Sequence, residues 1–236
     1  MWTAADYCLK VSADPAWLSH EAGRIFGLAW RRDFTAPGFC VLDLEPGVDS
    51  RALRALMVAL KSQLSEIAYR ETGRQLVYAS LARFDQQETT KFHLDGAPDE
   101  SMLMLGYEPS RVRSRLFLAD YSRAAFDAGI SPRQFLQDFN PMYRRGEDLL
   151  SRYTTELPQP GEGRPRILLV NNSSLPYTGE RTNSHGVLHK AEILNADASE
   201  RRIVNSTMLF SGGTDEVGPE QQREFVTTDK ISQKSY

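Results

Sequence analysis

The sequence predicts one mainly β domain with flanking helices, spanning residues 1–236. Short segments rich in β-branched, aromatic and leucine residues recur between residues 76 and 210, and turn-forming residues separate them. A longer segment near residue 50 carries apolar residues at three- and four-residue spacing, which is typical of an amphipathic helix. The Pro- and Gly-rich stretch 158–163 has strand-like segments on both sides, so we interpret it as a loop within one domain.

Residues 1–75 are expected to form N-terminal strands followed by one helix. Residues 24–30 (RIFGLAW) and 39–44 (FCVLDL) are short apolar runs separated by a Pro-Gly turn, and they predict two strands. Asp49 or Ser50 supplies an N-cap for the helix that follows. Its apolar stripe consists of Leu53, Leu56, Met57, Leu60, Leu64, Ile67 and Ala68.

Residues 76–212 are expected to form the core of the domain. The predicted strands are 76–84, 102–107, 112–121, 166–174, 186–194 and 202–210. Residues 131–157 have a helical pattern broken at Pro141, which predicts a helical insertion between strands. The polar residues 213–236 predict an irregular C-terminal tail.

Composition and charge narrow the classes of function. The formal net charge is −3, so there is no basic surplus and no nucleic-acid partner is expected. The two cysteines, Cys8 and Cys40, are too few for a disulfide framework. The chain does not open on a basic start followed by an apolar run, and no stretch reaches the ~18 apolar residues of a membrane span. We therefore expect a cytoplasmic protein without a membrane partner.

Three of the four histidines lie in two short segments. His93 and Asp95 are two positions apart directly after an expected strand, and His189 opens another. Side chains at i and i+2 of an extended segment point to the same face, so the imidazole and the carboxylate converge. Two histidines and one carboxylate on one face of an octahedron leave three positions open, as in non-haem Fe(II) oxygenases. The H-x-D spacing taken alone has an alternative interpretation, a polar pair in a loop. A structural zinc site is not expected here, because it would need four protein ligands.

The remaining histidines are expected to stay outside the metal site. His20 lies at the end of an expected N-terminal helix, and we interpret it as a surface residue. His185 precedes Gly186, which favours a loop role, with a role near the substrate as the alternative. His189 is preferred as the third ligand because an apolar strand follows it.

The order of these motifs resembles the Fe(II)/2-oxoglutarate-dependent dioxygenase superfamily. Residues 81–96 (LARFDQQETTKFHLDG) are similar to its strand, turn and H-x-D-G element, residues 166–176 to the strand before the distal histidine, and residues 183–210 to its distal half. The similarity covers residues 76–212, in which H-x-D, several strands, a histidine and an arginine follow in the family's order. The helical insertion and the slightly long spacing from His189 to the arginines depart from the family's pattern.

This resemblance implies a double-stranded β-helix, or jelly-roll, core and an oxygenase that uses Fe(II), 2-oxoglutarate and molecular oxygen. His93, Asp95 and His189 would bind the iron. An arginine, which can donate two parallel hydrogen bonds, would pair with the far carboxylate of 2-oxoglutarate. Arg201 and Arg202 point to opposite faces of a strand, so only one of them faces the site. The alternation of side chains along the strand does not decide which of the two arginines faces the site, and analogy with the family favours Arg202.

The substrate is expected to be a small molecule, such as an amino acid or a natural-product intermediate, that is hydroxylated or otherwise oxidised at a C–H bond. Thr90, Arg115 and Asn171 are candidates for substrate contact from their positions near the ligands, and each has a structural role as its alternative. A cupin-like metal enzyme without 2-oxoglutarate and a non-catalytic β-barrel binding module are the alternative functions. The helical insertion could form a lid or the surface of a homodimer.

Overall fold

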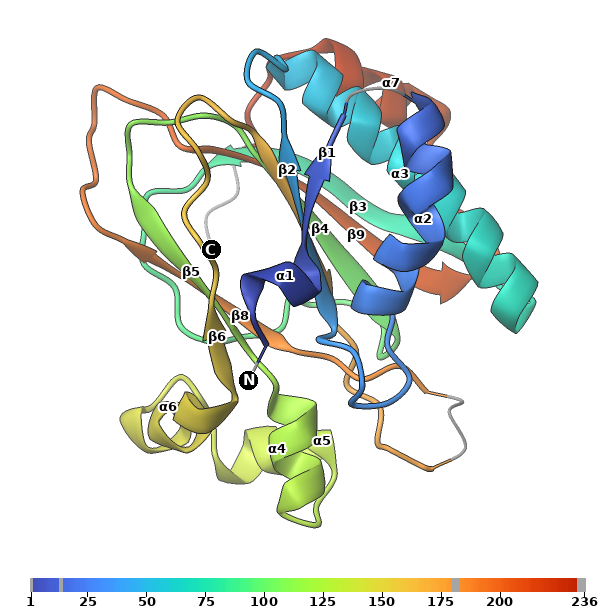
Figure 1. Ribbon diagram of the computed structural model, residues 1–236, viewed down its shortest axis with the longest axis vertical. Coiled ribbons are helices and arrows are strands. Elements are labelled where there is room, and N and C mark those ends of the chain that lie inside the picture. The colour runs from blue at the N-terminus through green and yellow to red at the C-terminus, as the bar shows by residue number, and fades with distance from the viewer. Residues whose placement is uncertain (1, 13–14, 180–182, 233–236) are drawn as a thin grey trace.

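The computed structural model describes residues 2–12, 15–179 and 183–232, and it shows two β-sheets facing each other (Figure 1). The larger sheet has the strand order β1-β2-β7-β4-β9-β3 and the smaller one β6-β5-β8. The strands are β1 (Cys8–Val11), β2 (Phe39–Leu44), β3 (Gln75–Asp85), β4 (Ser101–Tyr107), β5 (Ser114–Ala119), β6 (Thr154–Glu156), β7 (Arg166–Asn171), β8 (Leu188–Ile193) and β9 (Ile203–Gly212). Only the β1–β2 pair is parallel among these strands.

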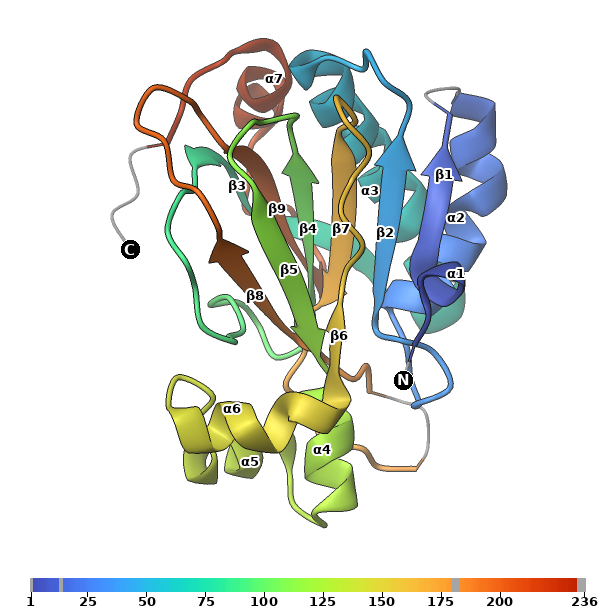
Figure 2. The same ribbon diagram turned by 60° about the vertical axis from the view of Figure 1, so that its left-hand side comes forward.

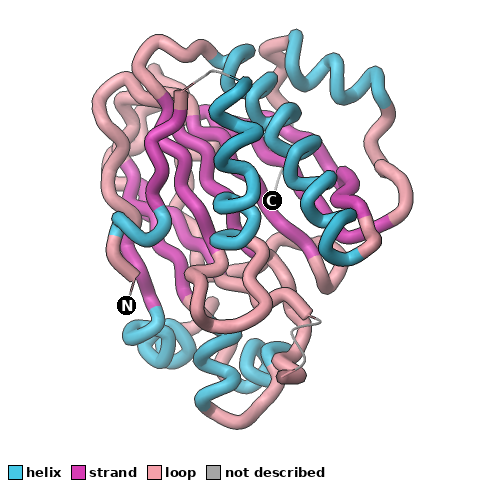
Figure 3. Tube along the Cα trace, turned by 45° about the vertical axis from the view of Figure 1, so that its right-hand side comes forward, coloured by secondary structure: helices cyan, strands magenta, loops and turns pink. Residues whose placement is uncertain are grey.

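Two groups of helices flank the sheets. Helices α2 (Pro15–Ala29), α3 (Ser50–Thr72) and α7 (Pro219–Thr227) cover the outer face of the larger sheet (Figures 1 and 3). Helices α4 (Tyr121–Asp127), α5 (Pro132–Asp138) and α6 (Arg144–Leu150), with the short turn η1 (Ser151–Tyr153), gather at one end of the sandwich (Figure 2). The remaining helix, α1 (Ala4–Tyr7), precedes β1. About 33% of the described residues are helical and 27% lie in strands, so the expected mainly β fold is corrected to a mixed one.

Helix α3 forms where the sequence predicts it, and for the expected reasons. The side chain of Asp49 accepts a hydrogen bond from the Ala52 amide (2.8 Å), which satisfies one of the free amides of the first turn. The helix ends at Gly73, whose φ of 71° is the left-handed conformation that glycine adopts without a steric penalty. All seven residues of the predicted apolar stripe are buried, against the sheet and α2.

Three clusters of buried side chains hold the layers together. The first lies between the helices and the outer face of the larger sheet, and the second lies between the two sheets. In β7, Ile167 and Leu169 belong to the first cluster and Leu168 and Val170 to the second, because alternate residues of a strand face opposite sides. This explains why residues 167–170 of β7 are apolar without interruption. The third cluster joins the start of β8 to α4–α6.

Some segments differ from the sequence prediction. Residues 24–30 are not a strand but the second half of α2 and the residue after it. The reason is an apolar stripe at helical spacing that packs on the sheet: Leu18, Ala22, Ile25, Phe26 and Ala29.

The other differences concern short elements. The predicted strand 112–121 is shorter, because Asp120 caps α4 through a hydrogen bond from the Arg123 amide (3.0 Å). The predicted irregular tail contains α7, which begins with Pro219 and buries Phe225. Strands β1 and β6 were not anticipated. Among the described residues, no helix is long and apolar enough to cross a membrane.

Candidate metal centre

Backbone pairing brings the two ligand segments together. The amides and carbonyls of His93 and His189 bond to each other in both directions, each at 3.2 Å, and form an isolated antiparallel bridge. Thr90 extends this pairing, because its amide donates to the Ala191 carbonyl and its hydroxyl accepts from the Ala191 amide, both at 2.9 Å. The two imidazoles therefore lie on one side of the bridge, with ring centroids 4.2 Å apart.

Asp95 is positioned by the segment that follows β7. The Asp95 amide donates to the side-chain oxygen of Asn172 (2.9 Å), and the Asn172 amide group donates back to the Asp95 carbonyl (3.0 Å). Asn172 is 3% exposed, so this clamp is sheltered from water. The carboxylate of Asp95 lies 3.4 Å from Nε2 of His93. The ligand atoms offered by His93, Asp95 and His189 all lie within 4.8 Å of one another.

A close backbone contact fixes the approach to His189. Gly186 lies against Ser173, and a Cβ at this position would be 2.1 Å from the Ser173 carbonyl oxygen. The next amide, that of Val187, donates to the Asn171 carbonyl (2.8 Å). Only glycine allows this approach, which sets the register in which His189 enters its strand.

The electrostatics of the three residues suit a cation. Burial lowers the pKa of His189 to about 4, and repulsion from His93 adds to this effect against the attraction of Asp95. The ring is therefore neutral at pH 7, as a metal ligand must be. Burial also lowers the pKa of His93, but the Asp95 carboxylate and the Lys91 carbonyl outweigh it and raise the pKa overall. Nδ1 of His189 is buried and has no hydrogen-bond partner among the described residues. These residues fit a divalent ion bound by two imidazoles and one carboxylate.

The three residues line a cavity of about 920 Å³ between the two sheets. Its inner walls are apolar and come from both sheets: Leu105, Leu116, Leu118, Leu168 and Val204. Tyr107, Thr90, Lys91 and Lys190 also line the cavity. The volume is that of a typical small-molecule site.

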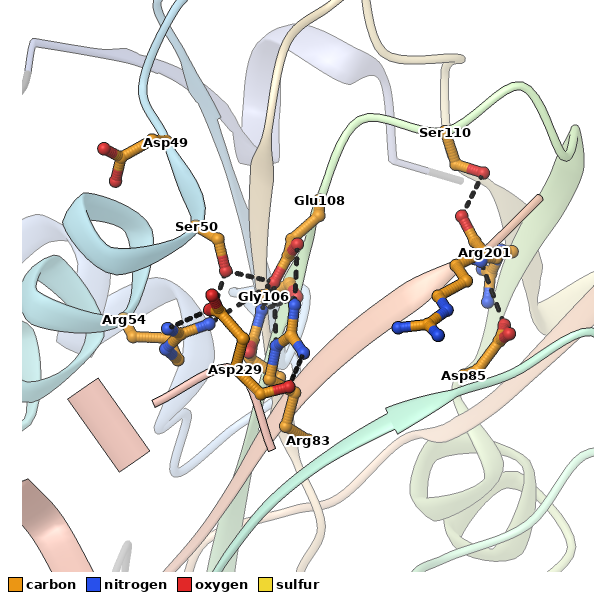
Figure 4. Close-up of polar contacts among 12 residues, drawn as sticks. Asp49, Ser50, Arg54, Arg83, Asp85, Gly106, Glu108, Ser110, Arg201 and Asp229 are labelled. Carbon is orange, nitrogen blue, oxygen red and sulfur yellow. Dashed lines mark hydrogen bonds and ion pairs between the residues drawn. The ribbon is translucent and has the colours of Figure 1, made fainter. Parts of the chain in front are cut away.

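The side chains of the two candidate arginines lie in different environments. Arg201 is exposed, and its carbonyl accepts a hydrogen bond from the Ser110 hydroxyl (2.8 Å; Figure 4). Arg202 is 4% exposed and points inward. Its guanidinium donates to the side chain of Gln86 (2.6 Å) and to the Ser114 hydroxyl (3.1 Å), and it lies 5.1 Å from the centre of the Tyr107 ring. It lines a smaller cavity of about 350 Å³ that shares Tyr107 with the metal cavity.

Of the three candidate substrate contacts, only Thr90 lines the metal cavity. Arg115 lies on the outer face of the smaller sheet, where it donates to both carboxylate oxygens of Glu156 (2.7 and 2.6 Å). Asn171 is fully buried, and its side chain accepts a hydrogen bond from the Ser173 amide (3.1 Å). The placement of Arg115 and Asn171 thus favours the structural alternative for both.

The other histidines lie apart from the cluster of possible ligands. His185 is buried against the rings of Phe34 and Tyr177, and its carbonyl accepts a hydrogen bond from Arg31 (2.9 Å). Burial, followed by the charge of Arg31, lowers the pKa of His185 to about 4. The side chain of His20 is 84% exposed, but it lies in the middle of α2 rather than at a helix end.

Sequence reasoning missed two features of the site. The only sequence signal for the clamp by Asn172 is its place at the end of a strand, directly before Ser173 and Ser174. Glu147 of α6 forms ion pairs with Lys190 and, at 3.7 Å, with Lys91. These lysines flank the histidines in sequence, but nothing in the sequence assigns them a common partner.

Comparisons with known proteins give similarities among solved structures only. No family model and no curated protein matches the sequence. The chain is similar in structure to an iron- and alpha-ketoglutarate-dependent endoperoxidase, with a TM-score of 0.38 and 15% identity over 78% of this chain and 80% of that chain. It is also similar to a taurine dioxygenase from Burkholderia xenovorans, with a TM-score of 0.41 and 10% identity over 92% of this chain and 91% of that chain.

Proposed function

We propose that this protein is an Fe(II)- and 2-oxoglutarate-dependent oxygenase that hydroxylates or otherwise oxidises a C–H bond of a small molecule. The observation that carries this proposal is the arrangement of His93, Asp95 and His189 at one side of a cavity between two sheets. Three protein ligands leave room for a cosubstrate and oxygen. The facing sheets are consistent with a jelly-roll core, and the proposal includes that architecture.

The chain's own residues prepare the site. His93 and His189 are held opposite each other by their backbone bridge, and Asn172 holds the segment of Asp95. When bound, iron together with 2-oxoglutarate and oxygen supplies the oxidation of the substrate, with release of succinate and carbon dioxide. The apolar walls exclude water and strengthen electrostatic contacts within the cavity.

Arg202 is the residue we assign to the far carboxylate of 2-oxoglutarate. It is the inward-pointing arginine of the pair, and it reaches Tyr107, which lines the metal cavity. Its guanidinium is held by Gln86 and Ser114, so its orientation is set before a ligand arrives. Thr90, which lines the cavity, is the residue we assign to substrate contact.

The test is metal and cosubstrate binding without oxygen. Fe(II) should bind, and titration with 2-oxoglutarate should produce the weak visible absorption of an iron–cosubstrate chelate. Replacement of His93, Asp95 or His189 by Ala should abolish both, because two ligands hold iron loosely. The exposed His20→Ala is the matched control and should change neither.

Other outcomes favour the alternative functions. Metal binding without the chelate would favour a cupin-like enzyme, and the absence of any metal binding would favour a non-catalytic module. If His185→Ala lost the metal while His189→Ala kept it, the third ligand would be reassigned.

A further inference from the structure

The segment after α7 forms part of the wall of the metal cavity. Residues 228–232 run beside β3, the edge strand of the larger sheet. The Ser232 amide donates to the Arg83 carbonyl (2.6 Å), and the Arg83 amide donates to the Ser232 hydroxyl (3.5 Å). The segment thereby provides hydrogen-bond partners for polar backbone groups that would otherwise be unpaired on an edge strand. Ile231 and Ser232 line the cavity that contains the metal centre.

A largely buried polar cluster contacts this segment and is centred on Glu108, directly after β4 (Figure 4). Its carboxylate accepts hydrogen bonds from Arg83 (Nε and Nη2, both 3.2 Å), from the Ser50 hydroxyl (2.5 Å) and from the Asn205 side chain (3.0 Å). Arg54 of α3 lies 3.6 Å away. Burial raises the pKa of Glu108, but these donors outweigh it and lower the pKa overall, so the carboxylate is ionised at pH 7. We call these five residues the Glu108 cluster.

The two arginines of the Glu108 cluster also hold the C-terminal segment. Nη1 of Arg83 donates to the Asp229 carbonyl (2.7 Å). Nη2 of Arg54 donates to the carbonyls of Val226 (3.3 Å) and Thr228 (3.1 Å) and to the Asp229 carboxylate (3.2 Å). The side chain of Arg54 is fully buried. Most of these acceptors are backbone carbonyls, so the contacts fix the path of the segment just before Ile231.

We propose that residues 228–232 are a fixed wall of the metal cavity and that Ile231 in this wall selects small molecules by size. Ile231 adds an aliphatic side chain to the lining of this cavity, to which Phe84 contributes from the end of β3. Because two buried arginines hold the preceding residues, the wall cannot move outward without breaking charge-assisted hydrogen bonds. The Glu108 cluster includes none of the proposed iron ligands. This inference rests on the proposed function for the nature of the reaction, but the wall itself is defined by contacts alone.

The first experiment tests how the wall is held, and it needs no metal. Glu108→Gln keeps the shape of the side chain and removes the charge that orients both arginines. Amide hydrogen exchange at Arg83 and Ser232 should become faster in this variant than in the unchanged protein. His20→Ala is the matched control, because the side chain of His20 is 84% exposed and lies on α2, outside the Glu108 cluster and outside residues 228–232. Unchanged exchange in Glu108→Gln would overturn the role of the cluster.

The second experiment tests selection by size. Succinate formation is measured with a panel of small carboxylic and amino acids of graded length. Ile231→Trp should raise KM about ten-fold or more for the longest accepted molecules, and Ile231→Ala should extend the panel to longer ones, with little change in kcat. His20→Ala should leave the panel unchanged, and all variants should form the iron–cosubstrate chelate.

A failure of the proposed wall can be distinguished from a failure of the proposed function. If the chelate forms but KM stays the same across the panel in both Ile231 variants, selection by the wall is wrong while the proposed function stands. If no chelate forms in the unchanged protein, the proposed function is wrong, and hydrogen exchange still decides whether the Glu108 cluster holds the wall.

Discussion

Arg201 and Arg202 are neighbours in sequence, yet their side chains occupy opposite environments. Arg201 is exposed, whereas Arg202 is buried beside Tyr107. Burial lowers the pKa of Arg202, against the attraction of Tyr107 and Asp85, and a guanidinium remains charged even in such places. A buried cation near the cavity is a costly feature that a bound carboxylate would offset.

Arg202→Ala should therefore weaken 2-oxoglutarate binding by about one to two orders of magnitude, because a charge-assisted pair contributes roughly 1.5–3 kcal/mol. Iron binding should be nearly unchanged. Arg202→Lys should recover only part of the affinity, since a point charge cannot donate two parallel hydrogen bonds. Titration of the chelate absorption measures the effect, with Arg201→Ala as the control. A large effect of Arg201→Ala alone would assign the contact to Arg201, and no effect of either would point to Lys91 or Lys190.

At the scale of elements, α6 is tied to the strand that carries His189. Glu147 pairs with Lys190 of β8 and with Lys91, and the Lys190 ammonium also lies 5.5 Å from the centre of the Phe92 ring. On its own helix the exposed pair Arg144–Asp148 faces away into solvent. The insertion is thus attached to both candidate ligand segments through lysines that line the cavity.

Glu147→Gln should loosen α6 locally, by about 1 kcal/mol or less because the pair is partly exposed. The hydrogen bond from Lys190, against the effect of burial, lowers the pKa of the Glu147 carboxyl below its usual value. A depressed pKa stabilises the folded protein above the ordinary value of 4.5, and this contribution is lost as pH falls through the folded pKa. Hydrogen exchange in residues 144–150 should therefore differ between Glu147→Gln and the unchanged protein at pH 7. The difference should shrink in acid. A difference that is constant with pH would show that the ion pairs do not hold the helix.

For the whole molecule, the candidate metal centre joins parts of the chain that are nearly a hundred residues apart. His93 and Asp95 lie before β4, whereas His189 lies in β8 of the smaller sheet. A bound ion would therefore connect segments that only the folded state brings together. Binding to the folded state alone stabilises a protein by mass action.

Saturating Fe(II), or Mn(II) as an oxygen-stable substitute, should raise the melting temperature. At a hundred times the Kd the gain is about 2.7 kcal/mol, which corresponds to roughly 5–10 °C for a chain of this size. Thermal unfolding with and without metal measures it, and Asp95→Ala should show no shift. An equal shift in Asp95→Ala would mean that the ion binds elsewhere.

The sequence by itself determined the local features. Helix α3 follows from its cap and apolar stripe, most core strands follow from short apolar runs, and the i, i+2 spacing indicated that His93 and Asp95 share a face. These local features depend only on residues close in sequence, whose relative positions follow from the regular geometry of a helix or an extended strand. The C-terminal helix and the helical state of residues 24–30 were not predicted, because packing against the sheet decides between strand and helix for such runs.

Only the tertiary structure decided the features that join distant segments. The bridge between His93 and His189, the clamp of Asn172 on Asp95 and the inward position of Arg202 depend on which strands become neighbours. The wall held by the Glu108 cluster joins α3, β3, β9 and the C-terminal segment, which no local pattern relates. Periodicity shows which face of an element is buried, but it does not show which other element covers that face. The cavity between the two sheets depends on which elements pack together, and only the tertiary structure shows this.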